Sequence, residues 1–292
     1  MAETWKTSLH GGHSGEFCEH ASATLRELLE AAVEFGFDTF GVSEHAPRSE
    51  ERFLYGTERE KGYTVERLET EFQAYSEECR RLAEEFADRL TVLRGFEAEV
   101  VPAETYADTM RRIRTEHEFD FMVGSVHYVH EIQVDGTPEE FSQLLERTGG
   151  LEQAAVDYYD QVAEMVTALQ PDVVGHLDLI RRNAAANAML DSPPIQAAAD
   201  RALEAVRAAD AILDLNTAGW RKKLGGPYPA PWLVERANRM GIGFCCGDDS
   251  HSPDDVGAGI LDARQYLLEN EVRRIRRITR RDDVVAKEWT EI

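Results

Sequence analysis

The sequence predicts an α/β fold in which a parallel sheet closes into a barrel related to the TIM type. Short apolar runs alternate with longer amphipathic segments along the chain, which is typical of strands alternating with covering helices. Seven such strands within 292 residues favour a closed barrel over an open sheet. No low-complexity linker or repeat interrupts the alternation, so we expect a single domain over residues 1–292.

The expected strands and helices follow one another in a regular order. Seven short runs, bounded by turn residues, are the expected strands: Trp5–Leu9, Thr39–Ser43, Thr91–Phe96, Phe121–Val126, Val173–His176, Ala211–Leu215 and Gly243–Cys246. Helical spacing of apolar residues predicts the helices Ser22–Phe35, Val65–Ala87, Ala103–His117, Leu151–Leu169, Pro194–Ala208 and Ala230–Met240. A last helix, near Ala258–Glu269, is followed by a basic tail with an acidic end.

The charge balance argues against a nucleic-acid partner. The formal net charge is −23, with 55 acidic and 32 basic residues, whereas phosphate backbones attract clustered Lys and Arg. A high-salt cytoplasm would favour such a surface, because salt screens its self-repulsion. Codon usage in a GC-rich genome, together with ordinary acidity, explains the composition equally well.

Hydropathy and cysteine content indicate a cytoplasmic protein without a membrane anchor. No apolar run approaches the roughly 20 residues that span a bilayer, and the first residues lack the pattern of a signal peptide. The four cysteines contain no Cys-x-x-Cys pair, which fits a reduced compartment better than secretion. The oligomeric state stays open.

Each expected strand ends in side chains that could bind a metal or take part in catalysis. In a barrel of parallel strands these ends lie on one face, where such barrels have their active sites. In chain order the side chains are His10 and His13, His45, Glu97 and Glu99, His127, His176 and Asp178, Asn216 and Arg221, and Asp249 and His251.

Any one of these histidines could be a loop residue with ordinary hydrogen bonds. Six strand ends with His, Glu or Asp need another explanation, because chance would not align them with element boundaries. Imidazole and carboxylate together are the ligands of zinc, iron, manganese and similar divalent ions. Since roughly nine ligands exceed the four to six that one ion takes, we expect two or three ions bridged by a carboxylate.

Closely spaced divalent ions are suited to the hydrolysis of a phosphate ester. They lower the pKa of a shared water and hold the oxygens of an in-line displacement at phosphorus, and a small phosphate monoester is the natural substrate. Asp249 or His251 could assist the alcohol leaving group. Arg181, Arg182 and Arg221 follow the fifth and sixth strands and could bind phosphate oxygens, although a solvated surface charge explains each arginine as well.

These motifs resemble those of the PHP (polymerase and histidinol phosphatase) family, and within it the histidinol-phosphate phosphatase branch. The similarity covers residues 7 to 260. It rests on Cys-Glu-His-Ala (18–21), Ser-Glu-His (43–45), Gly-Phe-Glu-Ala-Glu (95–99), Gly-Ser-Val-His-Tyr (124–128), Gly-His-Leu-Asp (175–178), Asn-Thr-Ala-Gly-Trp-Arg (216–221), Tyr-Pro-Ala-Pro (228–231) and Gly-Asp-Asp-Ser-His (247–251).

The resemblance implies a distorted (β/α)7 barrel with a trinuclear centre, in which a metal-bridging hydroxide attacks phosphorus and releases the alcohol. Zinc, manganese and iron are the candidate ions. Carried over by motif, the ligands are His10, His13, His20, His45, Glu97, His127, His176, Asp249 and His251. The expected catalytic residues are Asp249, His251 and the bridging Glu97; the expected substrate ligands are Arg221, Arg181 and Asn216.

The sequence departs from the family pattern in two places. The family's first pair is His-x-His, whereas this chain has His10-Gly-Gly-His13; the glycines permit a bulge or tight turn that would re-aim His13. If only one of the two histidines faces the metals, we expect His13. The family's Ser-Asp-x-His is Asp-Asp-x-His here, and we expect Asp248 to cap the turn or to support a ligand.

Five other residues with potentially reactive side chains are not expected to bind a metal or to take part in catalysis. His117 is expected at the surface end of a helix, and His130 in a solvated loop that could border the substrate entrance. Cys245 and Cys246 lie in an apolar strand and are expected to pack in the core. Cys18 adjoins a ligand segment, but thiolate ligation is the less favoured interpretation because nitrogen and oxygen ligands already suffice.

The leading hypothesis is hydrolysis of L-histidinol phosphate in histidine biosynthesis. A second hypothesis keeps the chemistry but changes the substrate to another small phosphate ester, such as a nucleotide or a sugar phosphate. A third is a metal-binding or partner-binding domain without turnover, which is less favoured because no ligand position is replaced. A DNA exonuclease is disfavoured by the charge.

Overall fold

Seven parallel strands form a nearly closed barrel. The computed structural model describes residues 4–184, 188, 190–281 and 284–292. The strands are β1 (Thr7–Ser8), β2 (Thr39–His45), β3 (Thr91–Ala98), β4 (Phe121–Gly124), β7 (Val173–Val174), β8 (Ile212–Asn216) and β9 (Phe244–Gly247), which neighbour one another in this order. A hydrogen bond from Leu9 N to Cys246 O (2.9 Å) links the first strand to the last. The predicted α/β barrel is confirmed.

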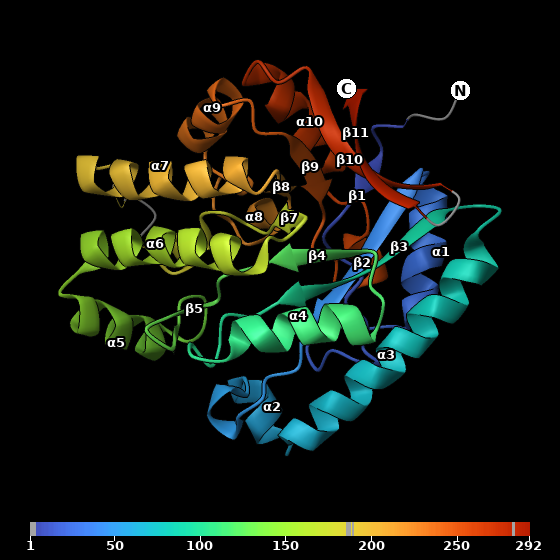
Figure 1. Ribbon diagram of the computed structural model, residues 1–292, viewed down its shortest axis with the longest axis horizontal. Helices are drawn as coiled ribbons and strands as arrows, with labels where there is room; N and C mark the ends of the chain where they lie inside the picture. Colours follow the sequence, from blue (N-terminus) through green and yellow to red (C-terminus); the bar gives the residue numbers. More distant parts are fainter. Residues whose placement is uncertain (1–3, 185–187, 189, 282–283) are drawn as a thin grey trace.

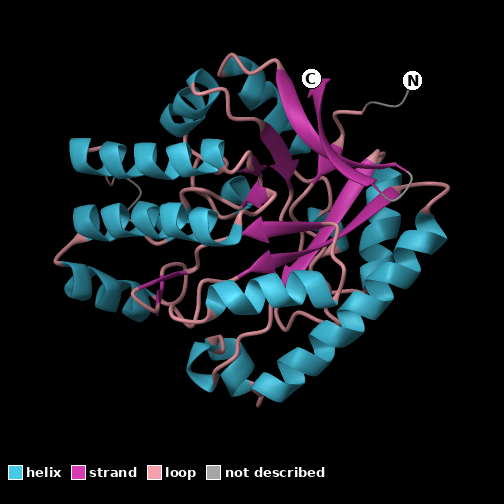
Figure 2. Ribbon diagram, in the orientation of Figure 1, coloured by secondary structure: helices cyan, strands magenta, loops and turns pink. Residues whose placement is uncertain are grey.

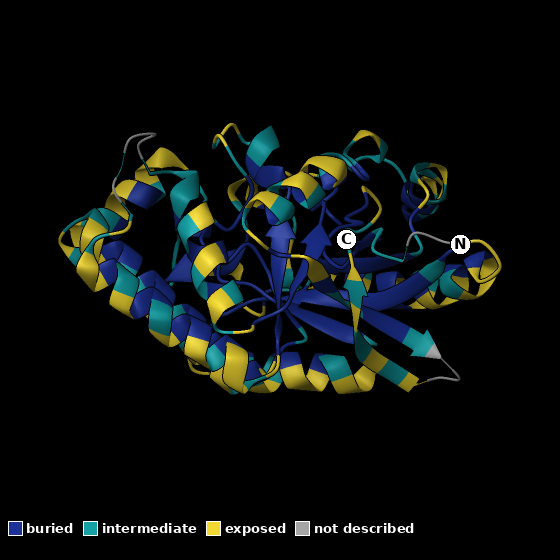
Figure 3. Cartoon of the chain, turned by 90° about the horizontal axis from the view of Figure 1, so that it is seen from above, coloured by how far each residue is buried: buried dark blue, intermediate teal, exposed yellow. Residues whose placement is uncertain are grey.

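Helices surround the barrel on its outside (Figures 1 and 2). They are α1 (Leu25–Phe35), α2 (Gly56–Glu60), α3 (Val65–Phe86), α4 (Tyr106–Glu116), α5 (Pro138–Thr148), α6 (Leu151–Leu169), α7 (Pro193–Ala208), α8 (Ala218–Arg221), α9 (Pro231–Arg239) and α10 (Ile260–Glu269). Their buried faces cover the strands, and their exposed faces point outward (Figure 3). None of the described helices combines the length and the apolar character that a membrane crossing requires.

Local capping explains where the helices begin and end. Thr24 and Glu27 form a capping box, so α1 starts at Leu25 rather than at the expected Ser22. Gly36 follows with φ 86°, a left-handed conformation that ends the helix without steric cost. All seven predicted helices are present, with ends that differ by a few residues.

Several elements were not predicted. They are helix α5, the short helices α2 and α8, the 3-10 helices η1 (Glu51–Phe53), η2 (Leu179–Arg182) and η3 (Pro253–Asp255), the hairpin β5 (Tyr128–Val129) with β6 (Ile132–Gln133), and the hairpin β10 (Arg274–Arg281) with β11 (Val284–Glu291). The sequence does signal α5, because Thr137, Pro138 and Glu140 form a capping box with proline in the first turn.

The barrel interior has its own small apolar cluster, to which the C-terminal hairpin contributes. Ile278 of β10 packs with side chains that the strands direct into the barrel: Leu9, Leu93, Phe121, Val123, Val173, Ile212 and Cys245. Cys245 and Cys246 are thus core residues, as predicted. Because the hairpin lies at the amino ends of the strands, the opposite end of the barrel is left for polar side chains.

Candidate metal centre

The nine predicted ligands gather at the carboxyl ends of the strands. The rings of His13 and His251 stack with their centroids 4.3 Å apart, and the centroids of His13 and His45 are 4.4 Å apart. On the other side, the rings of His127 and His176 are 5.0 Å apart. The residues come from different strands and loops, as expected if parallel strand ends share one face.

Glu97 lies at the centre of this cluster, at the end of β3. Its Oε1 is 3.2 Å from Nε2 of both His10 and His176 and 3.6 Å from His127 Nε2. Its Oε2 faces the other way and is 2.9 Å from His45 Nδ1. A carboxylate whose two oxygens face two groups of histidines is suited to bridge two ions.

Three further carboxylates orient three of the histidines by contacting the ring nitrogen that faces away from the centre of the cluster. Asp214 lies 2.8 Å from His10 Nδ1, Glu44 lies 3.2 Å from His13 Nδ1, and Glu99 contacts Nδ1 of His127. In each case the other ring nitrogen, Nε2, is left for the interior of the cluster. Carboxylates that fix the tautomer and direction of a histidine are the usual support of metal ligands.

Sequence reasoning missed two of these supporting groups. Glu44 precedes His45 in the Ser-Glu-His motif, and Asp214 precedes Asn216 by two residues on β8. Side chains two apart on a strand point to the same face, so an acid two residues before a strand-end asparagine was the available signal for Asp214.

The Gly11-Gly12 insertion explains how His10 and His13 both reach the cluster. Gly12 has φ 75°, and an added Cβ would lie 2.9 Å from Val42 Cγ1; at Gly11 it would lie 2.2 Å from Asp248 Oδ1. Only glycine fits such a left-handed, crowded turn. Both histidines are fully buried, so the geometry favours neither as the single ligand.

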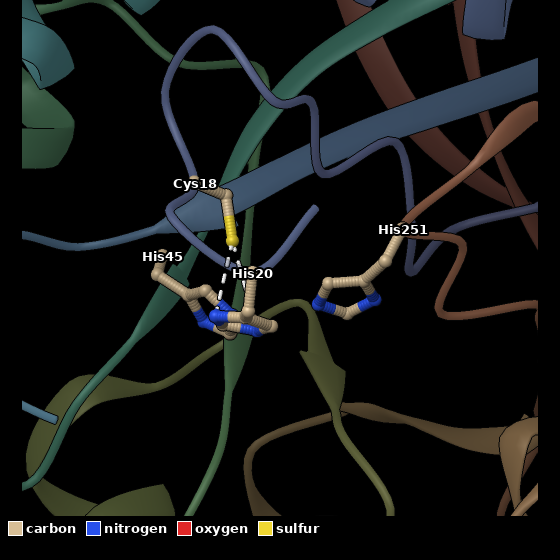
Figure 4. A group of neighbouring side chains, drawn as sticks. All are labelled: Cys18, His20, His45 and His251. Atoms are coloured by element: carbon tan, nitrogen blue, oxygen red, sulfur yellow. Dashed lines mark hydrogen bonds between the residues drawn. The ribbon is translucent and has the colours of Figure 1, made fainter. Parts of the chain in front are cut away.

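Cys18, His20, His45 and His251 form a further group (Figure 4). Cys18 Sγ lies 3.5 Å from His20 Nδ1, and the cysteine is buried. Burial raises the pKa of the Cys18 thiol well above its usual value, and the charge of Glu44 adds to this effect. Cys18 Sγ lies within 4.8 Å of donor atoms of His20, His45 and His251, so the sequence interpretation that it is not a ligand stays a prediction.

The donor atoms of the cluster fit divalent ions. Within the described residues, four groups place donor atoms within 4.8 Å of one another: Cys18, His20, His45 and His251; His10, Glu97 and His176; His10, His13 and Asp249; and His13, His45 and Glu97. Buried Nε2 atoms of His10, His13, His45 and His251 have no hydrogen-bond partner among these residues. Unpaired buried nitrogens are costly, and a metal ion would satisfy them.

The electrostatics keep much of the cluster ready to bind cations. Burial and the neighbouring His13 hold the pKa values of His45 and His251 well below normal, so both imidazoles are neutral. Burial would raise the pKa of Glu97, but the adjacent His10 and His127 lower it well below its usual range. Glu97, His45 and His251 are therefore in the forms that bind metals. His10, His13 and His127 differ: against the effect of burial, neighbouring carboxylates raise their pKa values, that of His127 to about 10, so these rings must release a proton when an ion binds.

Two of the predicted ligands have strained backbones. Asp249 has φ 50° and His176 has φ 22°, both in the left-handed region that non-glycine residues seldom adopt. Such strain concentrates at functional sites, where the surroundings fix a side chain in one direction. Hydrogen bonds from Asp249 N to His10 O (2.8 Å) and from Gly175 N to Gly124 O (3.0 Å) hold these segments in place.

A cavity of about 320 Å³ opens onto the cluster of candidate metal ligands. His20, His45, Glu97, His127, His176, Asp249 and His251 line its inner part, and Tyr55, Thr57, Gln133, Asp135, Leu179 and Lys222 are among the residues of its wall. The Lys222 ammonium group has no ion pair or hydrogen bond to another described residue, and it lowers the pKa of Asp249 against the effect of burial. Sequence reasoning missed Lys222.

The predicted substrate ligands do not reach this cavity. Arg221 donates to the backbone oxygens of Asp248 (2.6 Å) and Asp249 (3.0 Å) and pairs with Asp255. These hydrogen bonds hold the Arg221 guanidinium against the turn that carries Asp249. These contacts show that Arg221 positions the turn, and its role as a phosphate ligand stays a prediction.

Arg181 and Asn216 also have contacts within the protein, and their roles as substrate ligands stay predictions. Arg181 pairs with Asp178 at 2.9 Å and donates to Pro227 O, away from the cavity lining. Asn216 is buried and donates to Asp214 Oδ2 (3.0 Å) and Asp249 Oδ2 (3.3 Å). It thus joins Asp214, which contacts His10, to the predicted ligand Asp249.

The remaining polar candidates have structural contacts. Asp248 accepts hydrogen bonds from Gly257 N (2.9 Å) and Ser250 N (3.2 Å), which confirms its expected turn-capping role. His130 is exposed and lies 2.7 Å from Asp157. His117 ends α4 and packs against Phe72.

Comparisons with known proteins agree with this architecture. A model of the PHP domain matches residues 10–218. A Schizosaccharomyces pombe protein named "Probable histidinol-phosphatase" is 32% identical over 259 residues, which cover 87% of this chain and 84% of that protein. The histidinol-phosphatase of Saccharomyces cerevisiae is 26% identical over 294 residues, covering 89% and 88% of the two chains.

Solved structures show the same fold. A Listeria monocytogenes protein, solved as a candidate histidinol phosphatase, matches with a TM-score of 0.76 and 26% identity, over 88% of this chain and 99% of that one. Histidinol phosphate phosphatase from Lactococcus lactis, complexed with zinc, L-histidinol and phosphate, matches with a TM-score of 0.74 and 20% identity, over 93% and 96%. The likeness extends over nearly the whole of each chain.

Proposed function

The chain belongs to the PHP domain family, and from this premise we propose that it hydrolyses L-histidinol phosphate to L-histidinol and phosphate in histidine biosynthesis. The observation that carries the proposal is the buried group of histidines around Glu97, open to a cavity of small-molecule size. The names of the relatives at 32% and 26% identity, a probable histidinol-phosphatase and a histidinol-phosphatase, support the choice of substrate.

The metal centre of this proposal holds two or three divalent ions, with zinc, manganese and iron as candidates. Its ligands are His10, His13, His20, His45, Glu97, His127, His176, Asp249 and His251, with Glu97 as the bridge. Such ions make water a stronger acid near neutral pH and neutralise charge on phosphate oxygens. The unpaired imidazole nitrogens of the cluster support this assignment.

The protein's own groups bind and orient the ester beside this centre. Lys222 provides an ammonium group at the cavity wall, which is suited to a phosphate oxygen as a point charge. Asp249 and His251 lie at the inner end of the cavity, where the leaving alcohol needs a proton. His251 Nδ1 donates a hydrogen bond to the Asp249 backbone oxygen (3.0 Å), which leaves Nε2 directed to the cluster.

The setting of the proposed enzyme is the cytoplasm, where thiols stay reduced. All four cysteines are buried and free, as is usual in that compartment. The proposal includes a small-molecule substrate and no nucleic-acid or membrane partner.

The test is a phosphate-release assay with purified, metal-reconstituted protein. L-histidinol phosphate is compared with a nucleoside monophosphate and a sugar phosphate, because discrimination between substrates lies in the ratio of kcat/KM values. We expect the highest kcat/KM for L-histidinol phosphate, and its loss in Glu97→Gln. Equal or better turnover of the other esters would assign the centre to a different phosphate ester.

A further inference from the structure

Asp135 is an acidic side chain in the cavity wall that the proposed chemistry does not use. It lies in the loop between β6 and α5 and lines the cavity that contains the metal cluster. Within the described part of the chain, its carboxylate accepts one hydrogen bond, from Gln133 Nε2 at 3.3 Å, and it forms no ion pair. Asp135 is half-buried, so its carboxylate has lost part of its hydration. One hydrogen bond without an ion pair replaces that hydration only in part.

The loop that carries Asp135 is held firmly beside the metal centre. Val134 N donates to the backbone oxygen of His127 at 2.8 Å. The Asn183 side chain donates to the backbone oxygens of Val134 (3.2 Å) and Gly136 (3.0 Å), on both sides of Asp135. The carboxylate is therefore presented in a fixed place next to a predicted ligand, and a bound molecule would not have to order it.

Glu140, a neighbouring acidic residue in the cavity wall, already has hydrogen-bond partners within the protein. Its Oε2 accepts a hydrogen bond from Thr137 N at 2.8 Å in the capping box of α5. Tyr55, also in the wall, presents an aromatic ring near the same cavity, and the Arg48 guanidinium lies 4.2 Å from the centre of that ring. Asp135 is thus the wall carboxylate that remains for a ligand.

The cavity consequently has ionic features of both signs. The metal cluster and Lys222 are suited to a phosphate dianion, whereas Asp135 is suited to a cation and would repel a second anionic group. A phosphate ester whose alcohol part is cationic matches both features. A sugar phosphate supplies no cation, and a nucleoside monophosphate has a neutral base at pH 7.

We propose that Asp135 is a specificity-determining residue that pairs with a cationic group on the alcohol part of the substrate, so that the site selects phosphate monoesters bearing an ammonium or imidazolium group. The inference rests on the proposed function for the phosphate end of the substrate. It assigns to Asp135 the recognition of the other end.

The test compares wild type with Asp135→Asn, and with Glu139→Gln as a control on an exposed residue of the first turn of α5. The esters are L-histidinol phosphate and phosphoethanolamine, which are cationic, and glycerol phosphate, which is not. We expect Asp135→Asn to lower kcat/KM for both cationic esters by about 10- to 100-fold, mainly through KM. Its kcat/KM for glycerol phosphate stays within about twofold of wild type, and Glu139→Gln matches wild type throughout.

Calorimetric binding of L-histidinol to the metal-loaded proteins supplies a readout that does not depend on turnover. We expect about 10-fold weaker binding to Asp135→Asn, at an unchanged melting temperature. Equal losses for all three esters, or no loss for the cationic ones and for L-histidinol, would overturn the inference. Wild type that turns over phosphoethanolamine but not L-histidinol phosphate would overturn the proposed function, and a selective loss in Asp135→Asn would still support the inference.

Discussion

Glu97 contacts four histidines with two oxygen atoms, and this single side chain gives the site its form. Oε1 faces His10, His127 and His176, while Oε2 faces His45. A residue in this position is expected to divide the cluster into two neighbouring ion sites. Asp214, Glu44 and Glu99 contact Nδ1 of three histidines. These carboxylates order the ion sites, because they fix which ring nitrogen points inward.

Replacing Asp214 by Asn should weaken the centre without unfolding the barrel. The variant keeps the shape of the side chain but loses the charge that holds His10 through Nδ1. We expect a loss of about 10- to 100-fold in metal affinity or activity. Metal titration and kcat measure the change, with Asp262→Asn, exposed on α10, as the control. Unchanged metal affinity would show that Asp214 has no role in orienting His10.

Gly12→Ala should destabilise the protein more than an alanine at another left-handed glycine. Gly12 (φ 75°) is crowded by Val42, whereas Gly62 (φ 71°) has open space around it, so both variants carry similar backbone strain but only the first also clashes. We expect about 1 to 3 kcal/mol of additional destabilisation for Gly12→Ala. Urea unfolding of both variants gives the difference, and equal values would contradict the crowded turn.

At the scale of elements, the sequence predicted the repeating barrel units well and the additions to them poorly. The strand and helix periods of the barrel are local, so residues 39–43 and 65–87 could be assigned without the fold. The tail could not, because its two strands pair mainly with each other and carry many Arg and Glu residues. The contacts of Arg221 could not be predicted for a related reason: its backbone partners come from a distant loop.

The same limit applies within the site. Sequence spacing brought eight of the nine candidate ligands to one face, because strand ends define that face, and His20 was added by its family motif. It could not indicate Lys222 or Asp135, whose positions depend on the path of loops after β8 and β6. The supporting acids Asp214 and Glu44 were missed because their importance lies in a contact with a residue far away in the chain.

The C-terminal hairpin acts as a closure for the amino end of the barrel. Arg276, Arg277 and Arg280 pair with Asp210, Asp38 and Asp120, at 2.5, 2.8 and 3.3 Å. These acids stand directly before, or close to the start of, strands of the barrel. The hairpin therefore connects several strands at the end opposite to the metal centre, with Ile278 in the interior cluster.

Ile278→Ala tests this closure. The side chain is fully buried among the inward-facing strand residues, so its truncation should cost about 2 to 5 kcal/mol of unfolding free energy. Val284→Ala on the same hairpin, where the side chain is 64% exposed, should change stability by less than about 0.5 kcal/mol. Urea unfolding measures both. Similar small effects would mean that the hairpin adds little to the barrel.

At the scale of the whole molecule, the dominant physical feature is a formal charge of −23 on 292 residues. Many exposed carboxylates pair with arginines, such as Glu30 with Arg89 (2.9 Å), but exposed pairs contribute little and the excess charge remains. The cavity combines both signs, because the carboxylates of Glu97, Asp135, Glu140 and Asp249 line it together with histidines and Lys222.

Salt should therefore stabilise the protein. Screening shortens the reach of the repulsion between surface carboxylates to roughly 3 Å at 1 M salt, so we expect the melting temperature to rise from low to molar salt. Calorimetry at several concentrations of KCl measures the trend at fixed metal loading. A constant melting temperature would favour codon usage and ordinary acidity as the origin of the composition.

The central claim is that the residues around Glu97 form one centre for two or three divalent ions. Elemental analysis of freshly purified wild type and of Glu97→Gln, by mass spectrometry, tests it most directly. We predict two or three ions per wild-type chain and the loss of at least one ion in the variant, because a neutral amide cannot replace a bridging carboxylate. A wild-type protein that binds one ion or none after reconstitution with zinc, manganese or iron would contradict the account.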